Sequence, residues 1–388
     1  MNVKMKKMSE KEILEFTKKN LICANEEYPQ VCDDTVSFED FSNQIRNNLL
    51  KNIQGRKILY LDTKYWVEFR KVTMNVSTNT DYSSLLKIIK EKVSQGKLIC
   101  PISTTMFLEL IRQTDEKTKY ATATLMQELS LGIGFCFLFE RMYKEELNFF
   151  LNLKNQKIDK NIFDNANFVI GNPMIKLLNN SNSKEELRLK KSFLVWMSKI
   201  PFNELVNLIA TEQTDIDFEN SENEKAAKAL NDYKTANPNM KDKDLLLFLI
   251  KTIFTGYSKD IGKAFIESEK IANNKQYVNC DEKNSLILAA LLAHFIDTKK
   301  NFKDGLLDCF YIRIYLFYLL MKNKNRNIEP HDFNDISHAS EAIASSDFFF
   351  TEKFLSHELN NEKPSLAKEY NICVCNKPKD ALNALSLV

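Results

Sequence analysis

The run KILYLDTKYWVEF, residues 57–69, decides the fold. Its residues 58–61 are apolar without interruption, as in a parallel strand that is covered on both faces. The run then ends on a carboxylate, Asp62. A carboxylate at the end of a buried strand costs free energy unless it is paired, hydrogen-bonded or bound to a metal ion. The rest of the sequence must therefore supply a partner for Asp62.

The composition is that of a globular protein. The chain has 388 residues, of which 44% are hydrophobic and 27% charged, which is enough for two domains or for one domain with a large insertion. Glycine and proline number only 8 each, which favours long helices over an all-β fold. The formal net charge is +2, so any site for a polyanion has to be local.

Cysteine usage and hydropathy favour a cytoplasmic protein. The eight cysteines form no CxxC pair, and the N-terminal residues lack the apolar segment of a signal peptide. We therefore expect free thiols in a reducing compartment. The most apolar segment, 305–321, contains Asp308 and Arg313 and is shorter than a membrane span. It predicts a buried helix and no membrane association.

Strand and helix patterns alternate at both ends of a long helical stretch. The first group is a strand at 57–62, a helix at 80–96, a strand at 97–103 and a helix at 104–113. Residues 115–275 show helical patterns without a repeat or a convincing strand. The later elements are helices at 284–296, 305–321 and 334–346, a strand at 347–351, a helix at 352–359 and a strand at 371–376. The β-α-β-α order indicates an α/β protein with a parallel sheet.

These patterns divide the chain into four predicted regions. Residues 1–56 form a helical N-terminal segment. Residues 57–114 form the first half of an α/β domain, residues 115–275 form a large all-helical insertion, and residues 276–388 form the second half of the domain.

Acidic residues occur where ligands of parallel sheets bind, beyond the carboxyl ends of the strands. Asp62 ends the first strand, and Glu109 lies one to two turns into the helix that follows the second strand. Asp335 falls in the first turn of the helix before DFFFT, and Glu352 comes directly after that strand. Asp347 begins the strand, so it is expected about 15 Å from the site.

Carboxylates from distant parts of the chain are typical of a site for a hard divalent cation such as Mg²⁺ or Mn²⁺. Hydrolysis of a phosphodiester needs neutralisation of phosphoryl charge and an activated water molecule, and such ions supply both. A metal ion bound by Asp62, Glu109 and Asp335, with Glu352 as a further catalytic acid, would explain the carboxylate at the end of the first strand.

Three segments resemble the PIN-domain nuclease family: LYLDTKYWVEF, CPISTTMFLEL and NDISHASEAIASSDFFFTEKFL, within 57–113 and 330–388. The resemblance implies a PIN-like three-layer fold. It implies that Asp62, Glu109 and Asp335 are the metal-site acids, with Glu352 after Thr351 as the fourth. Single-stranded RNA, rather than DNA, is the substrate that it implies.

Four further residues are candidate substrate-binding positions: Lys64, Ser103, His338 and Thr351. Lys64 stands where the family usually has asparagine, so it either contacts a phosphate or signals altered chemistry. His338 follows Asp335 by three residues on the same helical face. It either contacts the phosphate or is a hydrogen-bonded histidine at the rim of the site.

The predicted function is a Mg²⁺- or Mn²⁺-dependent endoribonuclease. One alternative is an inactive module of the same fold that binds nucleic acid or, through the insertion, another protein. A second alternative is a receiver-like phosphoacceptor with Asp62 as the acceptor, although GRKILYLD lacks the earlier acids of such a site. The sequence leaves the oligomeric state open.

Each acid also has a structural interpretation. Asp62 can cap the turn after its strand. Glu109 can pair with Arg112 three residues later on the helix. Asp335 in a first helical turn is favourable for the helix dipole without any further role.

Overall fold

The computed structural model describes residues 28–158, 161–168, 183–208, 213–273, 280–298, 306–362 and 364–387. Residues 1–27 of the predicted helical N-terminal segment lie outside these residues. The described part of the N-terminal segment contains the 3₁₀ helix η1 (Pro29–Val31) and the helix α2 (Phe38–Lys51).

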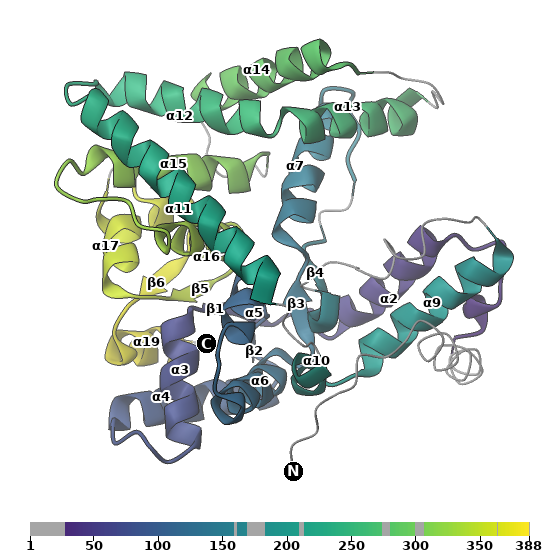
Figure 1. Ribbon diagram of the computed structural model, residues 1–388. Helices are drawn as coiled ribbons and strands as arrows, with labels where there is room; N and C mark the ends of the chain where they lie inside the picture. The colour runs from purple at the N-terminus through teal and green to yellow at the C-terminus, as the bar shows by residue number, and fades with distance from the viewer. Residues whose placement is uncertain are drawn as a thin grey trace.

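A four-stranded parallel sheet forms the centre of the α/β part (Figure 1). Its strand order is β2-β1-β5-β6, and the strands are β1 (Lys57–Leu61), β2 (Leu98–Ile99), β5 (Phe348–Phe350) and β6 (Cys373–Cys375). Both predicted halves of the domain therefore contribute to one sheet. The second strand is shorter than the predicted 97–103.

The helices of the α/β part lie close to their predicted positions. They are α3 (Thr63–Thr73), α4 (Thr80–Ser94), α5 (Thr104–Ile111), α15 (Asp308–Lys322), α16 (Asp332–Ile343), α17 (Lys353–Asn361), α18 (Leu366–Glu369) and α19 (Pro378–Leu385). Two of these helices begin at capping residues. The side chains of Asn79 and Ser103 accept hydrogen bonds from backbone N–H groups in the first turns of α4 and α5.

The two faces of the sheet are covered by different helices. Tyr60 and Phe349, whose ring centroids are 5.4 Å apart, face α16, where Tyr60 contacts His338. The next residue on β5, Phe350, faces the other way and contacts Tyr65 of α3. Alternation of side chains along a strand explains this division. The helices α3, α4 and α19 pack together on the second face. The arrangement is a three-layer α/β structure.

The prediction that 115–275 contains only helices is wrong. Two strands, β3 (Ile133–Phe135) and β4 (Phe163–Asn165), form an antiparallel pair in this region. The segment after β2 runs beside β3, with Ile102 N donating to the Ile133 carbonyl at 3.1 Å. β3 lies within the stretch 123–153, whose helical pattern runs across it, and two of the three residues of β4 are polar, so neither strand shows an apolar run of its own.

The remaining helices of the inserted region lie above, beside and below the sheet in Figure 1. They are α6 (Glu116–Ser130), α7 (Leu138–Asn152), η2 (Ala166–Phe168), α9 (Lys184–Lys199), α10 (Phe202–Leu208), α11 (Gln213–Ala236), α12 (Asp242–Gly256) and α13 (Ser258–Asn273). The helix α14 (Glu282–Thr298) follows and packs against α12 and α13.

The helices α2 and α9 have a small hydrophobic core of their own, at the right of Figure 1. Phe41 and Ile45 of α2 pack there with Leu194 and Val195 of α9. Arg46 joins this unit to the rest of the chain, because its guanidinium lies 2.7 Å from the Asp164 carboxylate on β4. The helix α2 therefore packs against the inserted region, whereas Arg56 at the end of the segment donates to the Leu98 carbonyl of β2.

Among the helices that the structure describes, every one is too short or too polar to cross a bilayer.

Replacing Phe349 tests the central pairing of the sheet. Phe349 is fully buried on β5 and contacts Tyr60 of β1. Phe349→Ala should lower the free energy of unfolding by roughly 3–5 kcal/mol, because it leaves a cavity between the sheet and α16. Urea denaturation measures the change. Val76→Ala, at a side chain that is 67% exposed, is the control and should change stability by no more than about 0.5 kcal/mol.

Candidate acidic site at the carboxyl end of the sheet

The strand register places the predicted acids at one edge of the sheet. Leu61 of β1 lies opposite Phe350 of β5, and Phe350 lies opposite Cys375 of β6. The next residue along β1 is Asp62, and the next along β5 is Thr351. The two residues are therefore neighbours where the strands end.

Asp62 is 6% exposed and has a specific partner in Thr351. The Thr351 hydroxyl donates to Asp62 Oδ2 at 2.6 Å, and Asp62 N donates to the Phe350 carbonyl at 3.0 Å. Asp62 is the N-cap residue of α3, but its side chain accepts no capping hydrogen bond from that helix. The turn-capping interpretation therefore does not account for its carboxylate.

Glu109 accepts hydrogens from several protein groups. The hydroxyl of Thr63 donates to its Oε2, and Asn334 Nδ2 donates to its Oε1 at 3.2 Å. His338 Nε2 lies 3.4 Å from Oε2 and forms an ion pair with it. Burial alone would raise the pKa of Glu109, but the charge of His338 and these contacts outweigh it and lower the pKa to about 2. Glu109 is therefore a carboxylate at neutral pH.

His338 lies behind the acids in a buried polar network. Its side chain is 1% exposed, and its Nδ1 lies 2.7 Å from the Tyr60 hydroxyl. That hydroxyl also contacts Ser103 Oγ at 2.7 Å and Glu341 Oε2 at 3.1 Å. Burial opposes the charge on His338, but Glu109 outweighs it and raises the His338 pKa to about 9. Burial raises the pKa of Glu341, so His338 serves as the counter-ion of Glu109.

Asp335 is the unsatisfied acid of the group. None of the hydrogen bonds or ion pairs found among the described residues involves its carboxylate. Burial and then the negative charges of Asp62 and Glu352 raise its pKa to about 7. That effect requires the three carboxylates to lie near one another. The edge of the sheet thus concentrates negative charge. The positive charge of His338 acts most strongly with Glu109, and it also lowers the pKa of Asp335, but not enough to offset burial and the two neighbouring acids.

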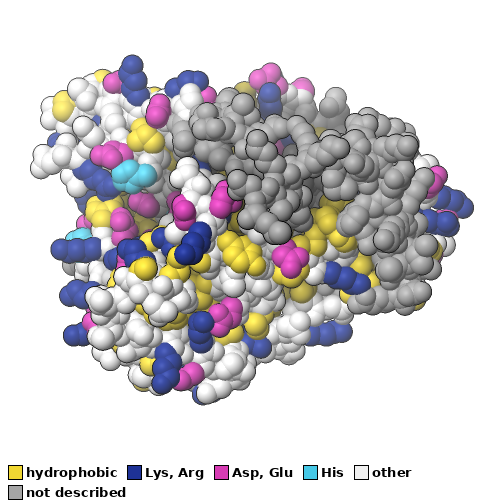
Figure 2. Space-filling model, turned by 60° about the horizontal axis from the view of Figure 1, so that its bottom comes forward, with side chains coloured by type: hydrophobic (Ala, Val, Ile, Leu, Met, Phe, Trp, Pro, Cys, Tyr) yellow, Lys and Arg dark blue, Asp and Glu magenta, His cyan; other side chains and the backbone are white. Residues whose placement is uncertain are grey.

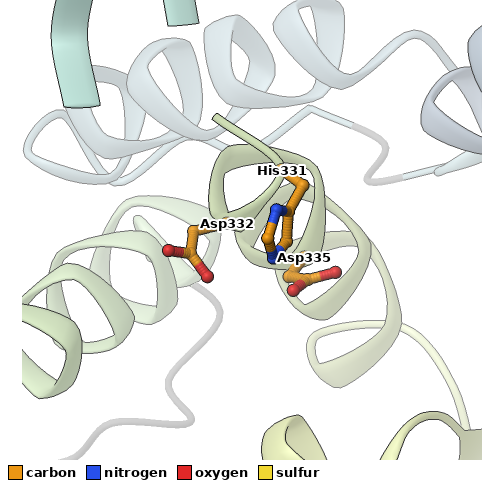
Figure 3. Close-up of side chains that lie close together, drawn as sticks. All are labelled: His331, Asp332 and Asp335. Atoms are coloured by element: carbon orange, nitrogen blue, oxygen red, sulfur yellow. The ribbon is translucent and has the colours of Figure 1, made fainter. Parts of the chain in front are cut away.

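One further set of possible ligands was not predicted. His331, Asp332 and Asp335 lie on the first turn of α16, and their ligand atoms are within 4.8 Å of one another (Figure 3). In the described part of the chain this is the one such set of three. Asp332, however, forms an ion pair with Arg326 and accepts a hydrogen bond from Glu329 N at 2.8 Å. Its carboxylate is committed to the start of the helix.

The sequence does contain a signal for this set. His331, Asp332 and Asp335 follow one another at spacings of one and three residues, which places them together in one helical turn. Only the contacts with Arg326 show that Asp332 has a structural role.

The four candidate substrate-binding residues differ in exposure. Lys64 is exposed at the start of α3, beside Asp62. Ser103 and Thr351 are completely buried, and His338 is nearly so. These three hold other side chains of the site, so we assign them a supporting role rather than contact with a substrate. His338 lies beneath the site and not at its rim.

Asp347 lies at the opposite end of the sheet, as expected. Its carboxylate accepts a hydrogen bond from Ile58 N at 2.8 Å and pairs with Lys57 Nζ at 2.7 Å. Its partners are complete without a ligand, and it serves as an internal comparison for Asp62.

The donor chemistry fits a hard divalent cation, although the present spacing is too wide for one. Mg²⁺ and Mn²⁺ prefer carboxylate oxygens, which Asp62, Asp335 and Glu352 carry, but the oxygens of these three do not all lie within 4.8 Å of one another. The Asp335 carboxylate forms no hydrogen bond or ion pair among the described residues, so a bound cation would relieve the repulsion that Asp62 and Glu352 exert on it. Glu109 fits less well as a ligand, because both of its oxygens already contact protein donors.

The surface around the fold is mixed in charge. On the face in Figure 2, Lys and Arg side chains are scattered among acidic ones. Attraction of a polyanion on this face would therefore depend on a few local cations, such as the exposed Lys64.

Asp335→Asn should stabilise the metal-free protein at pH 8. The pKa of Asp335 is raised from 3.8 to about 7, so the fold favours the protonated carboxyl. The stability that this form gives is fully present below pH 3.8 and is lost as the pH rises through 7. Asparagine cannot ionise, and the free energy of unfolding at pH 8 should rise by roughly 1–3 kcal/mol. Urea denaturation in a chelating buffer measures the gain, which should be smaller at pH 4. An equal gain at both pH values would contradict the assignment.

His338→Leu should destabilise the fold most near pH 6. The lowered pKa of Glu109 stabilises the fold above the unfolded pKa of about 4.3, and this stabilisation is lost as the pH falls toward 2. The raised pKa of His338 stabilises the fold below the unfolded pKa of about 6.5, and this stabilisation is lost as the pH rises through 9. Removing one partner of a buried pair should cost roughly 3–5 kcal/mol near pH 6. The deficit should shrink at pH 10, and unfolding curves at the two pH values test this. His357→Leu is the control at an exposed histidine.

The chain matches no family model, and no curated protein or solved structure is significantly similar to it. What the site can do therefore has to follow from its own residues and geometry.

Proposed function

We propose that the protein is a divalent-cation-dependent nuclease that hydrolyses phosphodiester bonds, with single-stranded RNA as the substrate. The observation that carries the proposal is the group formed by Asp62, Asp335 and Glu352. The charges of Asp62 and Glu352 act on Asp335, whose carboxylate forms no hydrogen bond or ion pair among the described residues. Like charges are rarely brought together in a fold without a ligand that compensates them.

The residues of the site have distinct tasks in this proposal. Thr351 fixes the Asp62 carboxylate through Oδ2 and leaves Oδ1 for a ligand. Asp335 and Glu352 provide further oxygens for Mg²⁺ or Mn²⁺. When bound, such an ion supplies Lewis acidity, which neutralises phosphoryl charge and lowers the pKa of a water molecule.

The other side chains of the site orient the acids and the substrate. Glu109 is held by Thr63, Asn334 and His338, so it adds fixed negative charge and orients the start of α16. The exposed ammonium of Lys64 is placed to bind a phosphate of the substrate as a point charge. The choice of RNA over DNA rests on the resemblance to PIN-domain nucleases alone.

A second candidate function is a binding module of the same fold without catalytic activity. Two observations favour it: both Glu109 oxygens already have protein donors, and Lys64 replaces the usual asparagine. Such a module would bind nucleic acid or a protein at this edge of the sheet.

Asp62→Asn should lower cleavage of a labelled single-stranded RNA at least about 100-fold in Mn²⁺ or Mg²⁺, because it removes a charged oxygen from the cation site. The matched control is Asp347→Asn, which changes an acid at the other end of the same sheet and should retain activity. Gel analysis of the products, with and without a chelator, provides the measurement.

The outcomes separate the candidate functions. Equal loss of activity in both variants would point to a stability effect rather than to the site. Wild-type protein that binds the strand but cleaves neither RNA nor DNA with either cation would support the binding module and refute the nuclease.

A further inference from the structure

Two cysteines lie side by side on the last strand of the sheet. Cys373 and Cys375 are separated by Val374, so their side chains leave the same face of β6. Their sulfur atoms are 3.8 Å apart. Cys373 is exposed and Cys375 is 8% exposed, so a reagent can reach the first thiol directly.

The two thiols differ in reactivity. The hydrogen bond between them lowers the pKa of Cys373 to about 7, whereas the same contact and burial raise the pKa of Cys375. A thiolate is the nucleophile in thiol–disulfide exchange, and a thiol whose pKa is near the ambient pH attacks fastest. Cys373 thus has the properties of an attacking thiol, and Cys375 is placed to attack second.

The position of β6 allows the two sulfur atoms to approach. In the described sheet β6 is an edge strand and pairs only with β5. Hydrogen bonds hold it there at both ends, from Cys373 N to the Asp347 carbonyl and from Thr351 N to the Cys375 carbonyl. Residues two apart in a strand have Cα atoms roughly 6.6 Å apart, near the upper limit for a disulfide, so closure requires a local bend. An edge strand bends more readily than a central one because it has one neighbour.

A cavity of about 790 Å³ adjoins the pair and includes Cys375 in its lining. Lys353, Lys377 and His357 also line it. The two lysines are exposed and can attract carboxylate groups. Asp380 and Glu352 are the acidic residues in the same lining. The cavity is large enough for a small anionic disulfide, whose carboxylates can pair with the two lysines.

We propose that Cys373 and Cys375 form a redox-active dithiol that a small anionic disulfide, such as glutathione disulfide, oxidises to an intramolecular disulfide. The Cys373 thiolate attacks one sulfur of the donor, forms a mixed disulfide and releases one thiolate. Cys375 loses its proton to solvent and attacks the Cys373 sulfur, which releases the second thiolate. The protein loses two electrons and two protons, and the donor is reduced to two thiols.

The other described cysteines lack this arrangement. Cys100, Cys136 and Cys309 are buried, and burial raises the pKa of each thiol. Cys32 and Cys280 are partly exposed, and the Cys280 sulfur contacts the hydroxyl of Ser285 at 3.4 Å. Cys280 therefore serves as a control for a single accessible thiol.

The test is incubation of the full-length protein with glutathione disulfide, followed by intact mass and peptide mapping after alkylation of free thiols. Wild type should form the Cys373–Cys375 disulfide with no retained glutathione, and dithiothreitol should reverse it. Cys375→Ser should retain one glutathione on Cys373. Cys373→Ser should form adducts at this pair at least about tenfold more slowly. Cys280→Ser should behave like wild type.

Two results would overturn the proposal. One is a stable glutathione adduct on wild-type Cys373, which would show that Cys375 does not displace it. The other is wild-type protein in which both thiols remain alkylatable while Cys280 is modified. Both readouts are masses of the protein itself, so they do not depend on the proposed nuclease activity and remain informative if that activity is absent.

Discussion

The pairing of β1 with β5 is the constraint on which the rest of the structure depends. Its register sets Leu61 opposite Phe350, and the backbone bond from Asp62 N to the Phe350 carbonyl extends the pairing by one residue. That single step places the Thr351 hydroxyl on the Asp62 carboxylate. A slip of one residue would reverse the direction of every side chain on the strand. Such a slip would break two contacts at once, Tyr60 with His338 and Asp62 with Thr351. The packing of the core and the position of the acids therefore both depend on this register.

The site contains more acids than cations. His338 compensates Glu109, and the burial of Glu341 favours the neutral form of that residue. On the open side, the charges of Asp62 and Glu352 raise the pKa of Asp335. At the other end of the sheet, the Asp347 carboxylate is instead paired with the partly exposed Lys57 and needs no further ligand. The excess of negative charge is therefore specific to one edge, and it is the physical reason for proposing a cation there.

Much of this fold could be predicted from apolar runs and their order along the chain. The runs at 58–61 and 348–350 are continuous because both faces of these strands are covered. β3 and β4 were missed because β3 lies within a longer helical pattern and β4 contains two polar residues. The position of Asp62 followed from where its strand ends. The buried roles of Ser103, His338 and Thr351 did not, because each depends on a side chain from a distant segment, which sequence spacing cannot reveal.

The connection between β1 and β5 has a consequence for how the chain acquires its structure during synthesis. Asp62 and Thr351, which touch in the folded protein, are 289 residues apart in sequence. The ribosome releases the N-terminal part first, so β1 remains without its central partner until almost the whole chain has emerged. The helices α12, α13 and α14 contact one another locally and can form before then. Although β2 can pair with β1 early, the edge of β1 that faces β5 stays open for most of translation, and an open strand edge is a site that a chaperone can protect.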